Sequence, residues 1–209
     1  MKREVIKSWF VILVVISFFI LASYIVQSNL EYFQKLIGND LGGMGIYVLI
    51  LVVSVVVAPV SAIPLLPVAS NLWGWVVAGI LSIIGWWIGA MIAFGLARVY
   101  GVPLVKKIVP LEKIARVERL IPEQNIFFGV VFLRMAVPVD ILSYVLGLFS
   151  YINFKKYALA TLIGISPFAF VFAYIGTLPI VFQIIALVVA IFIIYIGYFT
   201  VRFWKRRKL

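Results

Sequence analysis

Long apolar stretches that contain no charged residue dominate the chain. They run over Trp9–Val26, Leu41–Ala97 and Tyr157–Val201. About 20 apolar residues form a helix that crosses a bilayer core about 30 Å thick, and the accepted range begins near 17. The first stretch therefore predicts one transmembrane helix. The other two are long enough for several elements, so the residues that interrupt them decide the fold.

Prolines divide the second apolar stretch. Three of them stand within nine residues near its middle, and no regular helix accepts this, because each proline lacks an amide donor and clashes with the preceding turn. We expect two short helices, Met44–Ala58 and Val60–Gly74, that form a re-entrant hairpin. A full-length helix over Trp75–Ala97, closed by Arg98, should follow.

The same order returns in the second half. Ile126–Val137 and Val139–Ser150 are short apolar runs on either side of Pro138, and they predict a second proline-broken hairpin. A full-length helix over Tyr157–Thr177 follows. Each run of about 12 residues reaches only about 18 Å as a helix, which is too short to span the bilayer core.

The two halves are spaced alike. Gly85 and Gly164 each follow a hairpin proline by 26 residues, and at this offset Ser82 falls on Thr161. Because the hairpins enter from opposite sides, the halves would be related as an inverted repeat, an arrangement typical of transporters. The fold predicted is an all-α integral membrane protein, a helical bundle with two opposed re-entrant hairpins. Its expected domains are an N-terminal helix with an interfacial segment (1–43), the core (44–178) and a C-terminal helix with a basic tail (179–209).

Composition agrees with this fold. The 209 residues are 66% hydrophobic and 12% charged, with a mean hydropathy of +1.22, which excludes a soluble enzyme. The chain lacks Cys and His, so thiol and imidazole chemistry are excluded. The net charge of +11 comes from basic clusters beside apolar stretches, a topology signal rather than a nucleic-acid site. The predicted topology places 16 of 18 Lys and Arg residues, and both termini, in the cytoplasm.

Two charged residues interrupt the second hairpin. Arg134 and Asp140 stand six positions apart on either side of Pro138, and an ionisable group at membrane depth costs at least about 2.5–3.5 kcal/mol. A break at Pro138 would bring them together. Two interpretations follow, and both can hold at once: a salt bridge that clasps the hairpin, or a site in which Arg134 meets an anionic headgroup or solute while Asp140 orients it or exchanges protons.

The proline breaks should also expose backbone groups near the middle of the membrane, where only a protein interior or a wet cavity tolerates them. Polar residues stand close to both breaks and are candidates for lining such a cavity. The further substrate-site candidates are therefore Pro59, Ser61, Pro64, Asn71, Pro138, Ser143 and Tyr144. For each polar side chain alone, a local backbone hydrogen bond is the competing interpretation.

The run from Phe132 through Pro138 to Leu148, and the later run from Tyr157 to Pro167, resemble the core of the DedA/VTT superfamily, the SNARE-associated Golgi protein family. The resemblance extends over Val57–Gly176 and implies two opposed re-entrant hairpins and lipid movement between leaflets. Arg134 falls on the family's membrane-embedded arginine. Asp140 stands where the DedA branch has a second arginine, and Leu41–Ala97 lacks that branch's acidic residues, so the chain is closer to the Tvp-like branch.

The leading hypothesis is a protein of the plasma or inner membrane that moves lipids with anionic or phosphate headgroups between leaflets without ATP. The alternatives are a secondary transporter of an ion or small solute, and a scaffold that organises other membrane proteins. We expect no enzymatic activity, no cofactor and no metal. The partners predicted are membrane lipids and not nucleic acid, and a homo-oligomer is left open.

Overall fold

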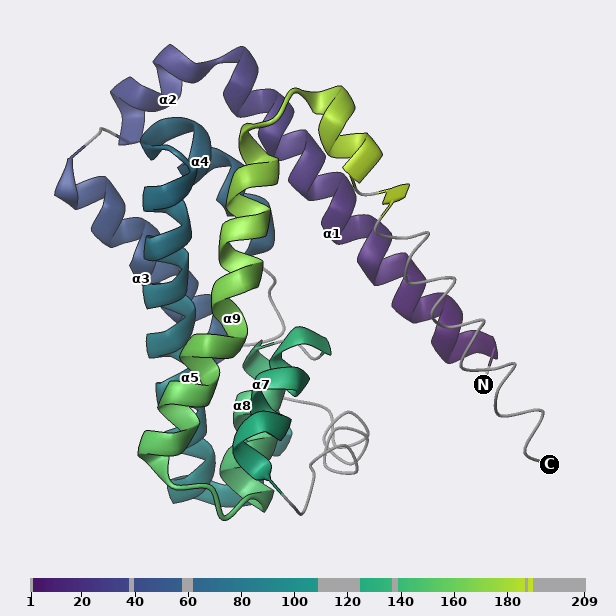
Figure 1. The fold of residues 1–209 in the computed structure, drawn as a ribbon, viewed down its shortest axis with the longest axis vertical. Coiled ribbons are helices and arrows are strands. Elements are labelled where there is room, and N and C mark those ends of the chain that lie inside the picture. The colour runs from purple at the N-terminus through teal and green to yellow at the C-terminus, as the bar shows by residue number, and fades with distance from the viewer. Residues whose placement is uncertain are drawn as a thin grey trace.

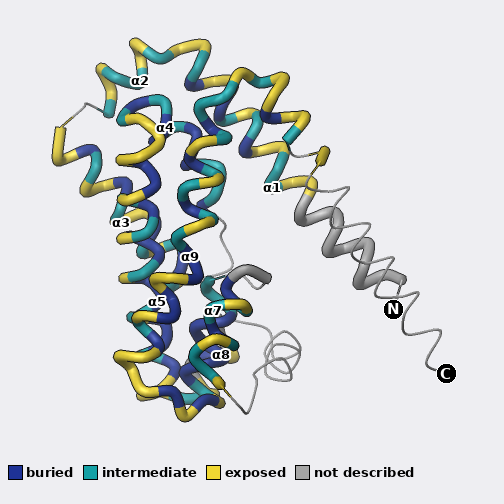
Figure 2. The backbone as a smooth tube through the Cα atoms, in the orientation of Figure 1, coloured by how far each residue is buried: buried dark blue, intermediate teal, exposed yellow. Residues whose placement is uncertain are grey.

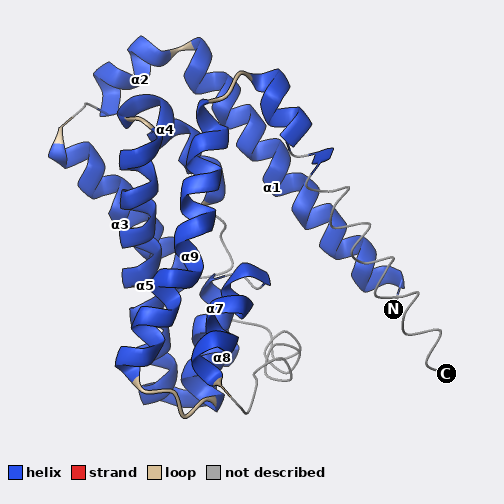
Figure 3. Ribbon diagram, viewed as in Figure 1, coloured by secondary structure: helices blue, strands red, loops and turns tan. Residues whose placement is uncertain are grey.

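The computed structural model describes residues 2–37, 40–57, 62–108, 125–136, 139–186 and 188–189, and every regular element among them is helical (Figure 3). This confirms the all-α membrane fold. Two segments, Trp75–Pro103 and Phe154–Thr177, are long and apolar enough to cross a bilayer. A third span is reached if the bent pair of Leu13–Ser28 and Leu30–Ile37 counts as one.

Helices α1 (Lys2–Ser28) and α2 (Leu30–Ile37) meet at a bend of 92°. Helix α2 carries Glu31 in its first turn and Lys35 in its last, which suits the helix dipole, and none of its residues is buried. This short helix, with Glu31 and Lys35 beside apolar residues, forms the interfacial segment that the sequence predicts after the first helix. Its position at a membrane surface stays a prediction.

The first unit consists of α3 (Leu41–Val57), the 3-10 turn η1 (Ile63–Leu65), α4 (Leu66–Trp73) and α5 (Trp75–Ile108). Two prolines of the predicted break begin helices instead of interrupting them. Each lies within the first two positions, at η1 and at α4, where a missing amide donor costs nothing.

The expected end of α5 at Arg98 is wrong. The helix continues until Gly101, where the backbone breaks at φ 63° and ψ −158°, and Pro103 follows. A charged side chain does not itself end a helix, whereas a positive φ does, and glycine adopts it without steric cost.

The second unit consists of α7 (Ile126–Ala136), α8 (Val139–Phe149) and α9 (Phe154–Thr177). Helix α9 begins three residues earlier than expected, because the Asn153 side chain accepts a hydrogen bond from the Lys155 amide at 3.0 Å and so caps the helix. Its predicted end at Thr177 is confirmed. The helix expected after Pro179 is described only as far as residue 189.

The long helices α5 and α9 lie side by side and antiparallel at the centre, with a buried interior and an apolar exterior (Figures 1 and 2). Helix α3 packs on α5 and α7 packs on α9, within their own units. The second helix of each hairpin crosses over, so that α8 packs on α5 and α4 on α9. A Cβ at Gly147 would lie 2.6 Å from the Phe94 carbonyl oxygen, so α8 touches the α5 backbone.

The two units repeat one contact. A Cβ on Gly85 would lie 2.7 Å from the Cβ of Leu51, and a Cβ on Gly164 would lie 2.7 Å from the Cβ of Arg134. Each Cβ would also lie close to the carbonyl oxygen three residues earlier on the hairpin helix, at 3.2 Å from that of Val48 and at 3.0 Å from that of Val131. A Cβ on Gly89 would meet the Cβ of Val55 at 2.8 Å in the same way. In each unit, glycines of the long helix therefore let the first hairpin helix approach closely, and the inverted repeat stays a prediction. The re-entrance of the hairpins into a bilayer stays a prediction.

Candidate functional site: a buried arginine among hydroxyl groups

Arg134 lies in the last turn of α7 and is only 4% exposed. Its Nη1 donates to the Val139 carbonyl at 2.6 Å. Its Nη2 donates to three hydroxyl oxygens, those of Ser143 at 3.0 Å, Tyr157 at 2.6 Å and Thr161 at 3.1 Å. We call these four acceptors the arginine cage.

Two helices hold the cage in place. Helix α8 contributes Val139 and Ser143, and the Ser143 hydroxyl donates back to the Val139 carbonyl. Helix α9 contributes Tyr157 and Thr161, which stand one turn apart and so project from the same face. Gly164 continues this face and leaves room for the Arg134 stem, since any Cβ there would overlap it.

The acceptors that the cage offers are all uncharged. Asp140, in the first turn of α8, also attracts the guanidinium electrostatically and is half-buried. The buried Arg134 Nε donates to no group that the structure describes. Burial of a cation is costly unless it is paired and fully hydrogen-bonded. Within the described residues, the site therefore holds a buried positive charge whose Nε has no acceptor.

Tyr157 links the cage to α5. Its ring stacks on Phe94 with centroids 4.0 Å apart and an interplanar angle of 17°. Its hydroxyl donates to the Ala90 carbonyl at 3.2 Å while it accepts from Arg134. A phenol hydroxyl has one proton to donate and can accept in addition, so both roles are satisfied at once.

Tyr144 connects the two hairpins. Its hydroxyl donates to the carbonyl of Val56, at the end of α3, at 2.5 Å, and its side chain is fully buried. Ser143, its neighbour in sequence, belongs to the cage. The structure thus brings Arg134, Asp140, Ser143 and Tyr144 together where α8 begins and α3 ends.

Asn71 and Pro64 lie in different surroundings. The Asn71 amide donates to the Gly176 carbonyl at 2.8 Å and to the Pro67 carbonyl at 2.7 Å, so it satisfies backbone groups near the end of α9. Pro64 lies in η1, which packs on α1 and α4. Three other candidates, Pro59, Ser61 and Pro138, lie outside the described residues.

The VTT domain matches residues 46–178, which include most of α3, every described helix from there to α9, and the whole cage. The chain belongs to the VTT-domain family, also called the DedA family. No curated protein and no solved structure matches the chain. Assignment to the Tvp-like branch stays a prediction.

VTT-domain proteins are a family of membrane transport proteins. The match leaves out α1, α2 and the described helix that follows Pro179, so the cage belongs to the shared domain and the outer helices do not. Within the described part of this VTT protein, no three His, Cys, Asp or Glu side chains converge as a metal site would require.

Sequence reasoning missed Tyr157 as a functional residue and used Thr161 only as the counterpart of Ser82. A signal was present, because Tyr157, Thr161 and Gly164 stand at i, i+4 and i+7 and form a polar and small-residue stripe on an otherwise apolar helix. Such a stripe facing an intramembrane arginine indicates where its hydrogen-bond partners lie.

Proposed function

We propose that this VTT-domain protein moves lipids with anionic headgroups between the two leaflets without ATP, and that Arg134 contacts the headgroup phosphate. One observation carries the proposal. Arg134 is buried, the hydrogen bonds that the structure describes for it go to neutral oxygens, and its Nε is left without a described acceptor. A phosphate oxygen is a better acceptor for a guanidinium than a neutral hydroxyl.

The cage suits exchange with a phosphate. A hydroxyl group can donate as well as accept, so Ser143, Tyr157 and Thr161 could turn their protons toward phosphate oxygens once Arg134 engages them. A carboxylate cage would instead repel the headgroup. In this proposal Asp140 limits how firmly the anion binds, because its negative charge lies close to the same guanidinium.

The proposal includes the orientation. The protein lies in the plasma or inner membrane with both termini in the cytoplasm, an arrangement supported by the 16 of 18 basic residues that it places inside. Each hairpin enters from its own side, and the three expected domains keep the bounds given above.

The test uses protein reconstituted in liposomes with fluorescent lipids in one leaflet. Tyr157→Phe removes one hydroxyl from the cage but keeps the ring on Phe94. Tyr47→Phe is the matched control, since the Tyr47 hydroxyl contacts the Ser82 hydroxyl in the first unit at 2.7 Å and no cage residue. We expect Tyr157→Phe to slow the exchange of phosphatidylglycerol about tenfold, the effect of roughly one charge-assisted hydrogen bond, and Tyr47→Phe to change it less than twofold.

The outcomes separate the competing functions. Equal effects of the two variants would reject a role for the cage in transport. If the parent protein shows no lipid exchange but transports a small anion, the secondary transporter is favoured, with Arg134 and Asp140 as its coupling pair. The absence of both lipid exchange and solute flux would favour the scaffold.

A further inference from the structure

Four side chains form a continuous stack between the end of the bundle and the buried arginine. The Arg98 guanidinium carbon lies 4.6 Å from the centroid of the Phe94 ring. Phe94 stacks on Tyr157, and the guanidinium carbon of Arg134 lies 5.4 Å from the Tyr157 centroid. Two cations thus flank two stacked rings.

The outer member of the stack is anchored to the end of α8. Arg98 is exposed on α5, and it donates to the carbonyls of Ser150 at 2.5 Å and Ile152 at 3.1 Å. The carbonyls around a helix end have no partner within the helix, so this arginine satisfies groups that α8 and the following turn leave open. These bonds fix the Arg98 guanidinium over the ring.

The inner members leave little freedom. Phe94 and Tyr157 are fully buried, and the Tyr157 hydroxyl bridges the Ala90 carbonyl and Arg134. A flat cation over one ring face and a parallel ring on the other restrict Phe94 from both sides. The position of the Tyr157 hydroxyl, which makes the shortest of the three hydroxyl contacts of Arg134, therefore depends on the stack.

We propose that Arg98 is a positioning residue for Arg134 and acts through Phe94 and Tyr157. The stack holds the arginine cage closed. Whether the Arg98 guanidinium stays over the Phe94 ring therefore affects how firmly the buried Arg134 is held. The meaning for transport rests on the proposed function, since a headgroup reaches Arg134 only when the cage opens. The positioning itself does not depend on which ligand enters.

The chain contains no cysteine, so Ser143→Cys gives a single reporter inside the cage. In detergent-purified full-length protein, the rate of its reaction with a membrane-permeant maleimide measures how often the cage opens. We compare four variants in this background. They are Phe94→Leu, Arg98→Gln, Arg98→Lys and, as control, Phe19→Leu, which removes a buried ring from the pair with Phe172 in the other core cluster.

The expected rates follow from the interactions that each variant removes. Phe94→Leu removes the ring that stacks on both Tyr157 and Arg98 and should speed labelling about tenfold, and Arg98→Gln removes the cation and should speed it about threefold. Arg98→Lys keeps a cation for Phe94 and a donor for the carbonyls, so it should stay within about twofold of the parent. Phe19→Leu should do the same.

Rates for Phe94→Leu no higher than for Phe19→Leu would overturn the proposal. So would equal rates for Arg98→Gln and Arg98→Lys, because a role confined to capping α8 needs only a donor. Arg98 is exposed, so its two variants provide the test even if Phe94→Leu does not fold. If Phe94→Leu and Arg98→Gln speed labelling but Tyr157→Phe leaves lipid exchange unchanged, the positioning role stands and the proposed function is rejected. If labelling is unchanged but Tyr157→Phe slows lipid exchange, the proposed function stands and the positioning role is rejected.

Discussion

Gly164 offers the sharpest test of the site, because the structure gives the space around it. A Cβ added there would lie 2.7 Å from the Cβ of Arg134 and 3.0 Å from both its Cγ and the Val131 carbonyl oxygen. The Arg134 stem cannot move away, because its guanidinium is held by the cage, and the carbonyl belongs to the α7 backbone. Gly164→Ala must therefore separate α7 from α9.

The magnitude has two parts. Overpacking a tight interior costs about 1–3 kcal/mol, and replacing a helical glycine by alanine returns about 0.5–1 kcal/mol. We expect Gly164→Ala to lower the free energy of unfolding, by up to about 2.5 kcal/mol. Gly95→Ala is the control for the second term, because a Cβ on Gly95 meets nothing within 4 Å, and it should stabilise the protein by about 0.5–1 kcal/mol.

A second comparison separates strain from chemistry. Gly85→Ala meets the Cβ of Leu51 at 2.7 Å, so it strains the first unit about as much as Gly164→Ala strains the second. Unfolding of purified protein in mixed micelles measures stability, and lipid exchange in liposomes measures function. Both variants should lose stability, but only Gly164→Ala should lose exchange beyond its loss of folded protein. The reasoning fails if Gly164→Ala and Gly95→Ala shift stability in the same direction, or if Gly85→Ala impairs exchange equally.

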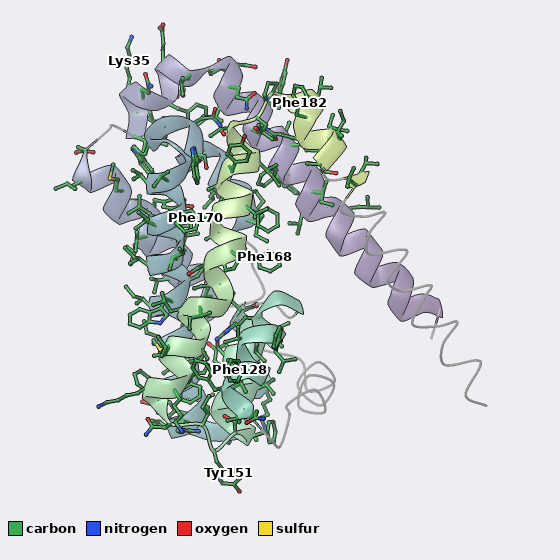
Figure 4. All side chains as sticks on the ribbon, in the orientation of Figure 1. Lys35, Phe128, Tyr151, Phe168, Phe170 and Phe182 are labelled. Carbon is green, nitrogen blue, oxygen red and sulfur yellow. The ribbon has the colours of Figure 1, made fainter. Side chains whose placement is uncertain are left out.

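Two further predictions concern charge and topology. Arg134→Leu should lower the free energy of unfolding measured in mixed micelles. Adding Asp140→Asn should recover only part of this loss, because the described hydrogen bonds of the guanidinium go to neutral oxygens. Full recovery would instead indicate a salt bridge that clasps the hairpin. Single cysteines replacing Lys35 and Tyr151, which lie exposed at opposite ends of the bundle (Figure 4), should react with an impermeant reagent from outside and inside respectively, and labelling of both from one side would contradict the predicted topology.

The order of helices was predictable because apolar run length and proline position are local properties. The short helices α7 and α8 and the end of α9 follow from these two signals alone. Helix ends that depend on one backbone angle or one cap were not predictable. The regular part of α5 ends at the positive φ of Gly101 and not at Arg98, and the Asn153 side chain starts α9 before Tyr157.

The site was predictable only in part, for a related reason. Arg134 stands out in the sequence because charge is rare in an apolar run. Its partners do not, because Tyr157 and Thr161 look like ordinary residues of a membrane helix until α7 is packed against α9. Phe94 is less visible still, since its role depends on a ring that stands 63 positions later and on a cation one turn away. Proximity between elements creates the site, and no local pattern contains it.

The two units of the repeat show how packing and chemistry separate. Both press a glycine of the long helix against the stem of one hairpin residue, but that residue is Leu51 in the first unit and Arg134 in the second. The first unit places a neutral pair, Tyr47 and Ser82, beside its leucine. The same helix packing requires only small residues at the contact. A second buried cation would cost a similar free energy again. Among the described helices Arg134 therefore forms the buried cationic centre, close to the point where Tyr144 joins the hairpins, and under the proposed function a headgroup from either leaflet would meet this same centre.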